Sequence, residues 1–205
     1  IGKGAFRTNA VPYERFVLPE GLETIETQAF EASVLPNGIV IPGSVRRIKN
    51  VAFSGCGWKN IVIPEGVEYI GLGSFQLNYA TEVSLPSTLK YIDEKAFLDN
   101  DFEKIVLPEG LRSLGLKAFI GCIYLKEIVI PDSVEVHPYA FDGCTGLEKV
   151  TFPEDLQIIH PGLFTGCTSL KSVELPKNLI ALENELFNGC SALEEIDFPE
   201  TLECI

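Results

Sequence analysis

Hydrophobic residues recur along this chain at fixed positions, with a period of 22 to 24 residues. One position is marked by prolines and another by phenylalanines. The prolines are Pro19, Pro42, Pro64, Pro86, Pro108, Pro131, Pro153, Pro176 and Pro199. The phenylalanines are Phe6, Phe30, Phe53, Phe75, Phe97, Phe119, Phe141, Phe164 and Phe187. A period in this range predicts a solenoid, in which each repeat buries its apolar edge only against its neighbours.

The repeats run without interruption through the whole chain, so we expect a single solenoid domain over residues 1–205. About nine repeats are predicted. They begin at Ile1, Ile25, Ile48, Ile70, Ile92, Leu114, Val136, Ile159 and Leu182. The chain begins and ends at the same phase of the repeat, and neither end has the polar, atypical repeat that closes most solenoids. We therefore expect it to be a fragment of a longer array.

Each repeat contains a short strand, as Leu170–Pro176 illustrates. Val173 and Leu175 are two residues apart and point to the same face of a strand, while Glu174 points away from it. Pro176 ends the strand because it has no amide proton to donate to a neighbour. When the equivalent segments stack in register, they are expected to form a ladder of parallel strands.

Two further segments complete the repeat. A second apolar pair, such as Leu22 and Ile25, is expected to be extended, and a second short strand is an open alternative there. The segment Ala-Phe-x-Gly-Cys then turns the chain. It is too short for a stable α-helix and favours a single tight helical turn. The seventh repeat has one residue fewer than the others between Pro131 and Phe141, which predicts an irregularity around Glu135.

The repeat resembles the leucine-rich repeats of the BspA-like, Treponema-type class. The motif is clearest in the segments Leu125–Pro131, Tyr139–Cys144, Leu186–Cys190 and Leu193–Pro199. The resemblance implies a leucine-rich-repeat right-handed superhelix, a β-rich α/β solenoid with tight helical turns. It also implies a place on large bacterial or protist surface proteins that adhere to host proteins or other cells. The chain departs from the motif where its first leucine is replaced, at Pro36, Trp58, Ala80 and Phe102.

Composition narrows the class of partner. The chain has 29 acidic and 16 basic residues and a formal net charge of −13, which argues against nucleic-acid binding because that needs a basic face. Its hydrophobic content of 46% is enough to build a core. No apolar run approaches the roughly 20 residues of a transmembrane helix.

Five of the six cysteines occupy one position of the repeat, where neighbouring Cα atoms would lie about 5 Å apart, within reach of a disulfide. A ladder of disulfides or of metal ligands is therefore conceivable. Other repeats place asparagine or serine there, and these side chains share a small size and the ability to bond to backbone in a turn. We interpret this cysteine position as structural. Its members are Cys56, Cys122, Cys144, Cys167 and Cys190.

Two other columns of residues could carry chemistry. His137 and His160 occupy equivalent positions, with Glu183 one repeat further on, and such a column resembles a metal face. Rungs of a ladder do not converge as a closed set of ligands must, so we interpret these side chains as members of an exposed turn and expect no metal. Tyr69 and Tyr91 share a position on adjacent repeats, and we interpret this pair as packing rather than as a binding site.

The sequence contains no motif for catalysis or for a cofactor. No serine, threonine or cysteine stands in a pattern with histidine that would activate a nucleophile. Phosphate loops and dinucleotide fingerprints are absent from the sequence as well. We therefore expect that the protein is not an enzyme and uses no cofactor.

The best candidate for a binding surface is the residue that points outward between the two core residues of each first strand. Along the array this row is Val17, Val40, Val62, Ser84, Val106, Val129, Thr151, Glu174 and Asp197. A flanking row, two residues earlier, contains Lys104, Glu127 and Lys149. Exposed β-branched residues can reflect strand propensity alone, but an elongated apolar patch that ends in charge is also a plausible contact surface for a protein.

These observations favour a non-catalytic protein-interaction or adhesion module of a bacterial cell-surface protein, located extracellularly or at the cell surface. The expected partner is a protein or another cell-surface macromolecule, bound on the sheet face by Val40, Val62, Ser84, Val106, Val129, Thr151, Lys104, Glu127 and Lys149. The alternative is a structural spacer or stalk that displays another domain. Such a spacer would bind no partner by itself.

Overall fold

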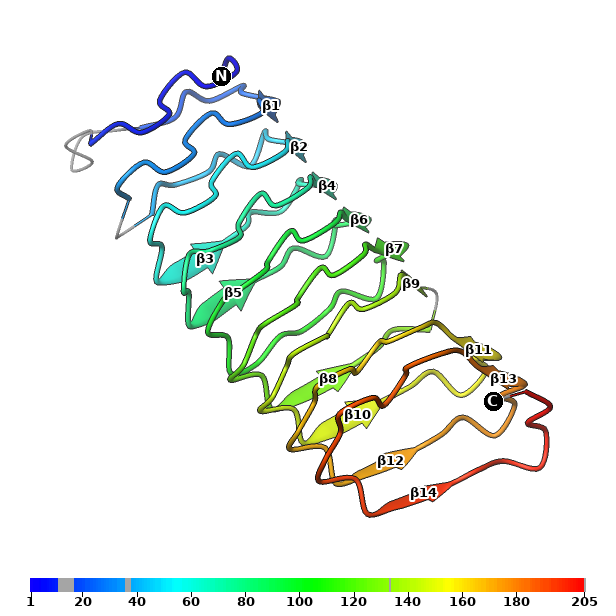
Figure 1. Ribbon diagram of the computed structural model, residues 1–205. Helices are drawn as coiled ribbons and strands as arrows, with labels where there is room; N and C mark the ends of the chain where they lie inside the picture. The colour runs from blue at the N-terminus through cyan, green and yellow to red at the C-terminus, as the bar shows by residue number, and fades with distance from the viewer. Residues whose placement is uncertain (11–16, 36–37, 133, 205) are drawn as a thin grey trace.

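A computed structural model shows the chain as an elongated stack of similar turns (Figure 1). The structure describes residues 1–10, 17–35, 38–132 and 134–204. One phenylalanine from each repeat stacks on the next along the whole array, with ring centroids 5.1–6.2 Å apart. These nine rings span about eight turns of solenoid, where the sequence predicted about nine repeats. Pro36, which was assigned to the first-leucine position, lies outside the described residues.

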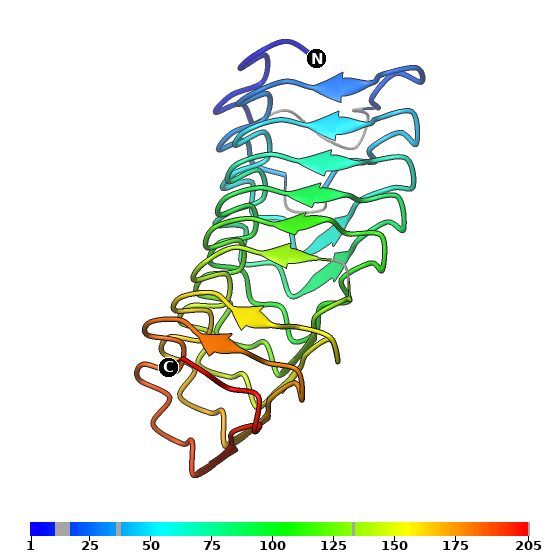
Figure 2. The same ribbon diagram turned by 90° about the vertical axis from the view of Figure 1, so that its right-hand side faces the viewer.

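Two rows of short strands run along different sides of the stack (Figures 1 and 2). The second apolar pair of each repeat forms the longer row. Its members are β1 (Thr24–Ile25), β2 (Arg47–Ile48), β4 (Tyr69–Ile70), β6 (Tyr91–Ile92), β7 (Ser113–Leu114), β9 (Glu135–Val136), β11 (Ile158–Ile159) and β13 (Ala181–Leu182). The first six of these form one continuous parallel sheet. The second apolar pair is therefore a strand, which the sequence had left open.

The first strands of the repeats, which end before the prolines, form the other row. They are β3 (Asn60–Val62), β5 (Glu82–Ser84), β8 (Glu127–Val129), β10 (Lys149–Thr151), β12 (Ser172–Glu174) and β14 (Glu195–Asp197). All pairings are parallel and in register, as predicted, but they join the strands only two at a time: β3 with β5, β8 with β10, and β12 with β14. The expected continuous ladder is thus interrupted on this side.

The predicted helical turn around the phenylalanine is wrong, and the described residues contain no helix. A 3₁₀ helix needs consecutive amides to donate to the residue three before them. Here only alternate amides do so: Glu31 donates to Gln28 within the turn at 3.2 Å, whereas Phe30 donates to Ala52 of the next repeat at 2.8 Å. Ala32, with a φ of 52°, reverses the chain direction. Half of the amides in this turn therefore bond to the neighbouring repeat instead of bonding within a helix.

The residues that replace the first leucine are buried like a leucine. Trp58, Ala80 and Phe102 are each at most 1% exposed. The ring of Trp58 leans on Phe53 with centroids 4.8 Å apart, and that of Phe102 meets Phe97 edge-on at 6.0 Å. Large and small side chains at one position are tolerated because neighbouring repeats fill the remaining space.

The cysteine position holds the backbone of adjacent turns together. The thiols of Cys56, Cys122, Cys144, Cys167 and Cys190 each donate to the carbonyl of the phenylalanine one repeat earlier, at 3.0–3.5 Å. Where the repeat has another residue, Asn78, Asn100 or Ser33, its side chain donates to the same carbonyl. The structural interpretation of this position is confirmed, and the thiols are free.

The six-stranded sheet ends at β9, in the repeat that is one residue short. The next strand, β11, pairs with β13 in a separate two-stranded sheet, and Figure 2 shows the gap between β9 and β11. The irregularity expected around Glu135 is therefore confirmed. A side chain spans the same region: the Tyr139 ring lies against Gly162 of the next repeat, and the Tyr139 hydroxyl donates to Glu185 of the one after, at 2.9 Å.

Candidate binding face

The row of outward residues predicted from the sequence is exposed on the side of the first strands. Val40, Val62, Val106 and Val129 are 55–83% exposed, and Ser84 and Thr151 are exposed as well. The strand register aligns Val62 with Ser84 and Val129 with Thr151. Alternation along each strand explains this placement, because the residues on either side of the row point into the core. We call this surface the strand face.

The flanking row lies beside the strand face and is also exposed. The amino group of Lys104 lies 3.6 Å from the Glu127 carboxylate. The backbones of these two residues form an isolated parallel bridge. Glu127 is in turn the register partner of Lys149. Both side chains of the Lys104–Glu127 pair are more than half exposed, so the pair contributes little to stability. Its charges remain available to a partner.

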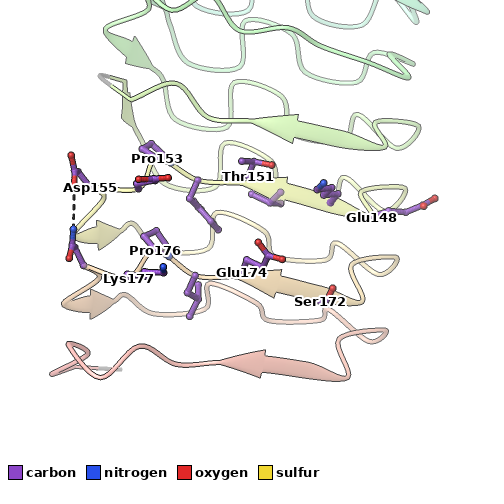
Figure 3. Close-up of a pocket in the computed structure, with 14 residues that line it drawn as sticks. Glu148, Thr151, Pro153, Asp155, Ser172, Glu174, Pro176 and Lys177 are labelled. Carbon is purple, nitrogen blue, oxygen red and sulfur yellow. Dashed lines mark hydrogen bonds between the residues drawn. The ribbon is translucent and has the colours of Figure 1, made fainter.

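The strand face is hollowed between β10 and β12. β10 pairs with β8 and β12 pairs with β14, but no backbone hydrogen bond joins β10 to β12. The resulting groove has a volume of about 710 Å³ and is lined by both strands and by the proline turns that follow them (Figure 3). The turns are linked at one end of the groove, where the Asn178 amide donates to Asp155 at 3.3 Å.

The walls of the groove combine polar and apolar groups. Lys149 and Thr151, both predicted site residues, line one side together with Phe152. Glu174 and Leu175 line the other side. Sequence reasoning placed several of these residues in the outward row but missed the groove itself. Nothing in the motif at β10 and β12 marks the lost pairing, which becomes visible only when adjacent repeats are placed in space.

The histidine column separates into two pairs. His160 Nδ1 lies 3.2 Å from the Glu183 carboxylate, as stacking predicts, but His137 is paired with Glu135, two residues earlier in the chain, at 3.8 Å. The gap between β9 and β11 lies between the two histidines. No cluster of three or more His, Cys, Asp or Glu side chains that could hold a metal ion occurs in the part of the chain that the structure describes.

The two tyrosines are register partners on β4 and β6. The Tyr69 ring carries the guanidinium of Arg47 at 4.5 Å from its centroid, and the Tyr69 hydroxyl donates to Asp93 at 2.8 Å. Burial, together with this hydrogen bond to a carboxylate, raises the pKa of Tyr69 to about 12. Tyr69 therefore takes part in polar contacts on the six-stranded sheet, in addition to its place beside Tyr91.

Family comparison agrees with the geometry of the repeat. A model of the BspA type leucine rich repeat region, in six copies, matches residues 1–126 and 113–205. The chain belongs to the BspA-type leucine-rich repeat family. No curated protein matches it in sequence. In the described residues of this BspA-type array, no helix is long and apolar enough to cross a membrane.

Several solved leucine-rich repeat proteins are similar to this chain at low sequence identity, and the first of those below shares its fold. The leucine rich repeat protein of T. pallidum is 24% identical, with a TM-score of 0.61 over 96% of this chain and 86% of that one. A leucine-rich repeat protein from Bacteroides ovatus is also 24% identical, with a TM-score of 0.46 over 92% and 67%. A leucine rich cell surface protein from Faecalibacterium prausnitzii is 20% identical, with a TM-score of 0.39 over 88% and 68%.

Proposed function

We propose that this BspA-type array is a non-catalytic interaction module of a bacterial cell-surface protein, and that it binds a macromolecular partner through the strand face. The observation that carries the proposal is the exposed, aligned row of β-branched residues on that face. The family resemblance supports an extracellular or cell-surface location and a role in adhesion, which we include in the proposal. A net charge of −13 favours a partner other than nucleic acid.

The chemistry of the strand face suits a protein partner. Val62, Val106 and Val129 expose more than half of their surface to water, and covering them would release that apolar area from solvent. Lys104 and Glu127 lie beside them and can set the orientation of the partner through charge. An apolar centre with charged residues at its margin is the usual composition of such an interface.

The groove between β10 and β12 adds a recess to an otherwise shallow surface. A partner side chain that enters it would contact Phe152 and Leu175 and could bond to Thr151 or Glu174. Pockets of this kind are where binding energy concentrates in protein interfaces, because water is excluded there. We propose that the groove anchors the partner and that the valine row extends the contact.

The test is partner capture with an altered strand face. The chain is immobilised, incubated with solubilised surface proteins of candidate target cells, and the captured proteins are identified and then measured individually for affinity. The double substitution Val62→Glu with Val106→Glu places two charges in the apolar row and should weaken binding at least tenfold. Both side chains point into solvent, so the fold should be retained, which circular dichroism and the melting temperature check.

Val34→Glu is the matched control. Val34 is 60% exposed, between the 55% of Val62 and the 68% of Val106, but it is not a member of the outward row. Its substitution should leave capture unchanged. Equal binding by the double variant and the wild type would exclude the strand face. If the wild-type chain captures no partner at all, the result supports the alternative, a spacer that displays another domain.

A further inference from the structure

The six-stranded sheet carries a second recess, away from the strand face. Across this sheet the register aligns Arg47, Tyr69, Tyr91, Ser113 and Glu135. The side chains in this column are large as far as Tyr91, and the next one, Ser113, is small. Two residues after Ser113, Gly115 is also small. A Cβ at Gly115 would lie 2.6 Å from the Asp93 backbone, which explains the glycine there. A hollow of about 350 Å³ results.

The hollow lies beside an aromatic ring that carries no cation. In the described part of the chain, two tyrosine rings hold a basic side chain: Arg47 lies over Tyr69 at 4.5 Å and Lys117 over Tyr139 at 5.4 Å. Tyr91 is next to Tyr69 in the column and is 41% exposed, and the small Ser113 follows it. Two tyrosines of the array thus hold a cation, and the small Ser113 leaves room for the same kind of group beside Tyr91.

A carboxylate is held at the wall of the hollow. One oxygen of Asp93 accepts the hydroxyl of Tyr69 at 2.8 Å, and the other accepts the amide of Glu94 at 2.7 Å. Neighbouring acids have cationic partners, since Glu94 is paired with Lys95 and Glu68 with Lys90. Asp93 forms no ion pair with any lysine or arginine that the structure describes. Its charge is fixed in place and uncompensated.

The remaining walls define the shape of the group that fits. Leu116 contributes an apolar side and His137 closes the far rim. The hollow is therefore lined by the rings of Tyr69 and Tyr91, the Asp93 carboxylate, the Ser113 hydroxyl and the apolar Leu116. Its volume is at the lower end of the range for small-ligand sites, which suits one side chain rather than a folded surface.

We propose that this hollow is a binding site for an arginine side chain presented by a partner protein. The guanidinium stacks on Tyr91 and donates to Asp93, while its methylene groups contact Leu116. A planar guanidinium can stack and form a directed pair with a carboxylate at once, which the compact ammonium of lysine cannot do equally well. The net charge of −13 draws a basic partner toward the array. This site is independent of the strand face and of the function proposed for it.

The experiment uses small probes that isolate the side chain. Nα-acetyl-arginine methylamide, the lysine analogue and the neutral citrulline analogue are titrated into the ¹⁵N-labelled chain, and amide shifts are followed by NMR. We expect saturable shifts at Tyr91, Asp93, Ser113 and Leu116 with the arginine probe. Lysine should bind several-fold more weakly, and citrulline, which keeps the shape without the charge, should not saturate.

Substitutions separate this site from general attraction to an acidic protein. Tyr91→Ala should weaken arginine binding about fivefold, Asp93→Asn by at least as much, and Tyr91→Phe should retain it because the ring is kept. Tyr79→Ala, at a tyrosine that is 54% exposed elsewhere, is the matched control and should have no effect. Equal binding of citrulline or lysine, shifts spread over other acidic surfaces, or full binding by Tyr91→Ala would each overturn the proposal.

Discussion

Asn78 offers a direct test of how adjacent turns are held together. Its side chain occupies the cysteine position and is 1% exposed. The Asn78 Oδ1 atom accepts the amides of Cys56 and Trp58 at 3.0 and 3.2 Å, and its Nδ2 atom donates to the Phe53 carbonyl at 2.9 Å. One side chain therefore serves three backbone groups of the preceding repeat.

The substitution Asn78→Ala removes these partners where water cannot replace them. A buried polar group left without a hydrogen bond costs about 1–3 kcal/mol. Counting the two amides alone, we expect the free energy of unfolding to fall by about 2–6 kcal/mol. Asn78→Cys introduces the residue that other repeats use and keeps a donor for Phe53, so its loss should be smaller than that of Asn78→Ala.

Urea unfolding followed by circular dichroism measures the change, and the fluorescence of Trp58, the only tryptophan, reports on the same turn. A difference between the two midpoints would show that this turn opens separately from the rest, which is common in repeat arrays. Asn188→Ala, at an exposed asparagine of another turn, is the control and should cost less than about 0.5 kcal/mol. A loss below about 1 kcal/mol for Asn78→Ala would refute the role assigned to this position.

Two further predictions concern the seventh to ninth repeats and the thiols. Gly162→Ala should lower the free energy of unfolding by about 1–3 kcal/mol, because Gly162 has a φ of 61° and its Cβ would meet the Tyr139 ring, whereas Gly2→Ala, in open space, should be neutral in thermal unfolding. Burial raises the pKa of Cys122 from 9.0 to about 12, so above pH 9 the unfolded chain releases a proton that the folded chain retains, and stability falls as the pH rises. Cys122→Ala should reduce that fall by about 1 kcal/mol between pH 8 and 10 in urea titrations, and an equal fall in both proteins would contradict it.

The sequence predicted the repeat and its register because both depend on local periodicity. Proline ends each first strand and phenylalanine marks each repeat, so the stacking of the repeats in register and the structural role of the cysteine position could be foreseen. The exposed positions of Val62 and Val129 followed from simple alternation. The helical turn was predicted wrongly because the motif does not show which amides donate to the next repeat.

One candidate site was predicted from the sequence, and the others were not. The valine row is a property of each repeat taken alone, so the alternation of residues was enough to predict it. The groove at β10 and β12, the hollow beside Tyr91 and the separation of His137 from His160 are relations between repeats. They arise where a pairing is lost or where a small residue follows a large one in register. They could be recognised only in three dimensions, because small offsets between neighbouring turns determine whether adjacent strands form hydrogen bonds, and a motif shared by all repeats cannot encode such differences.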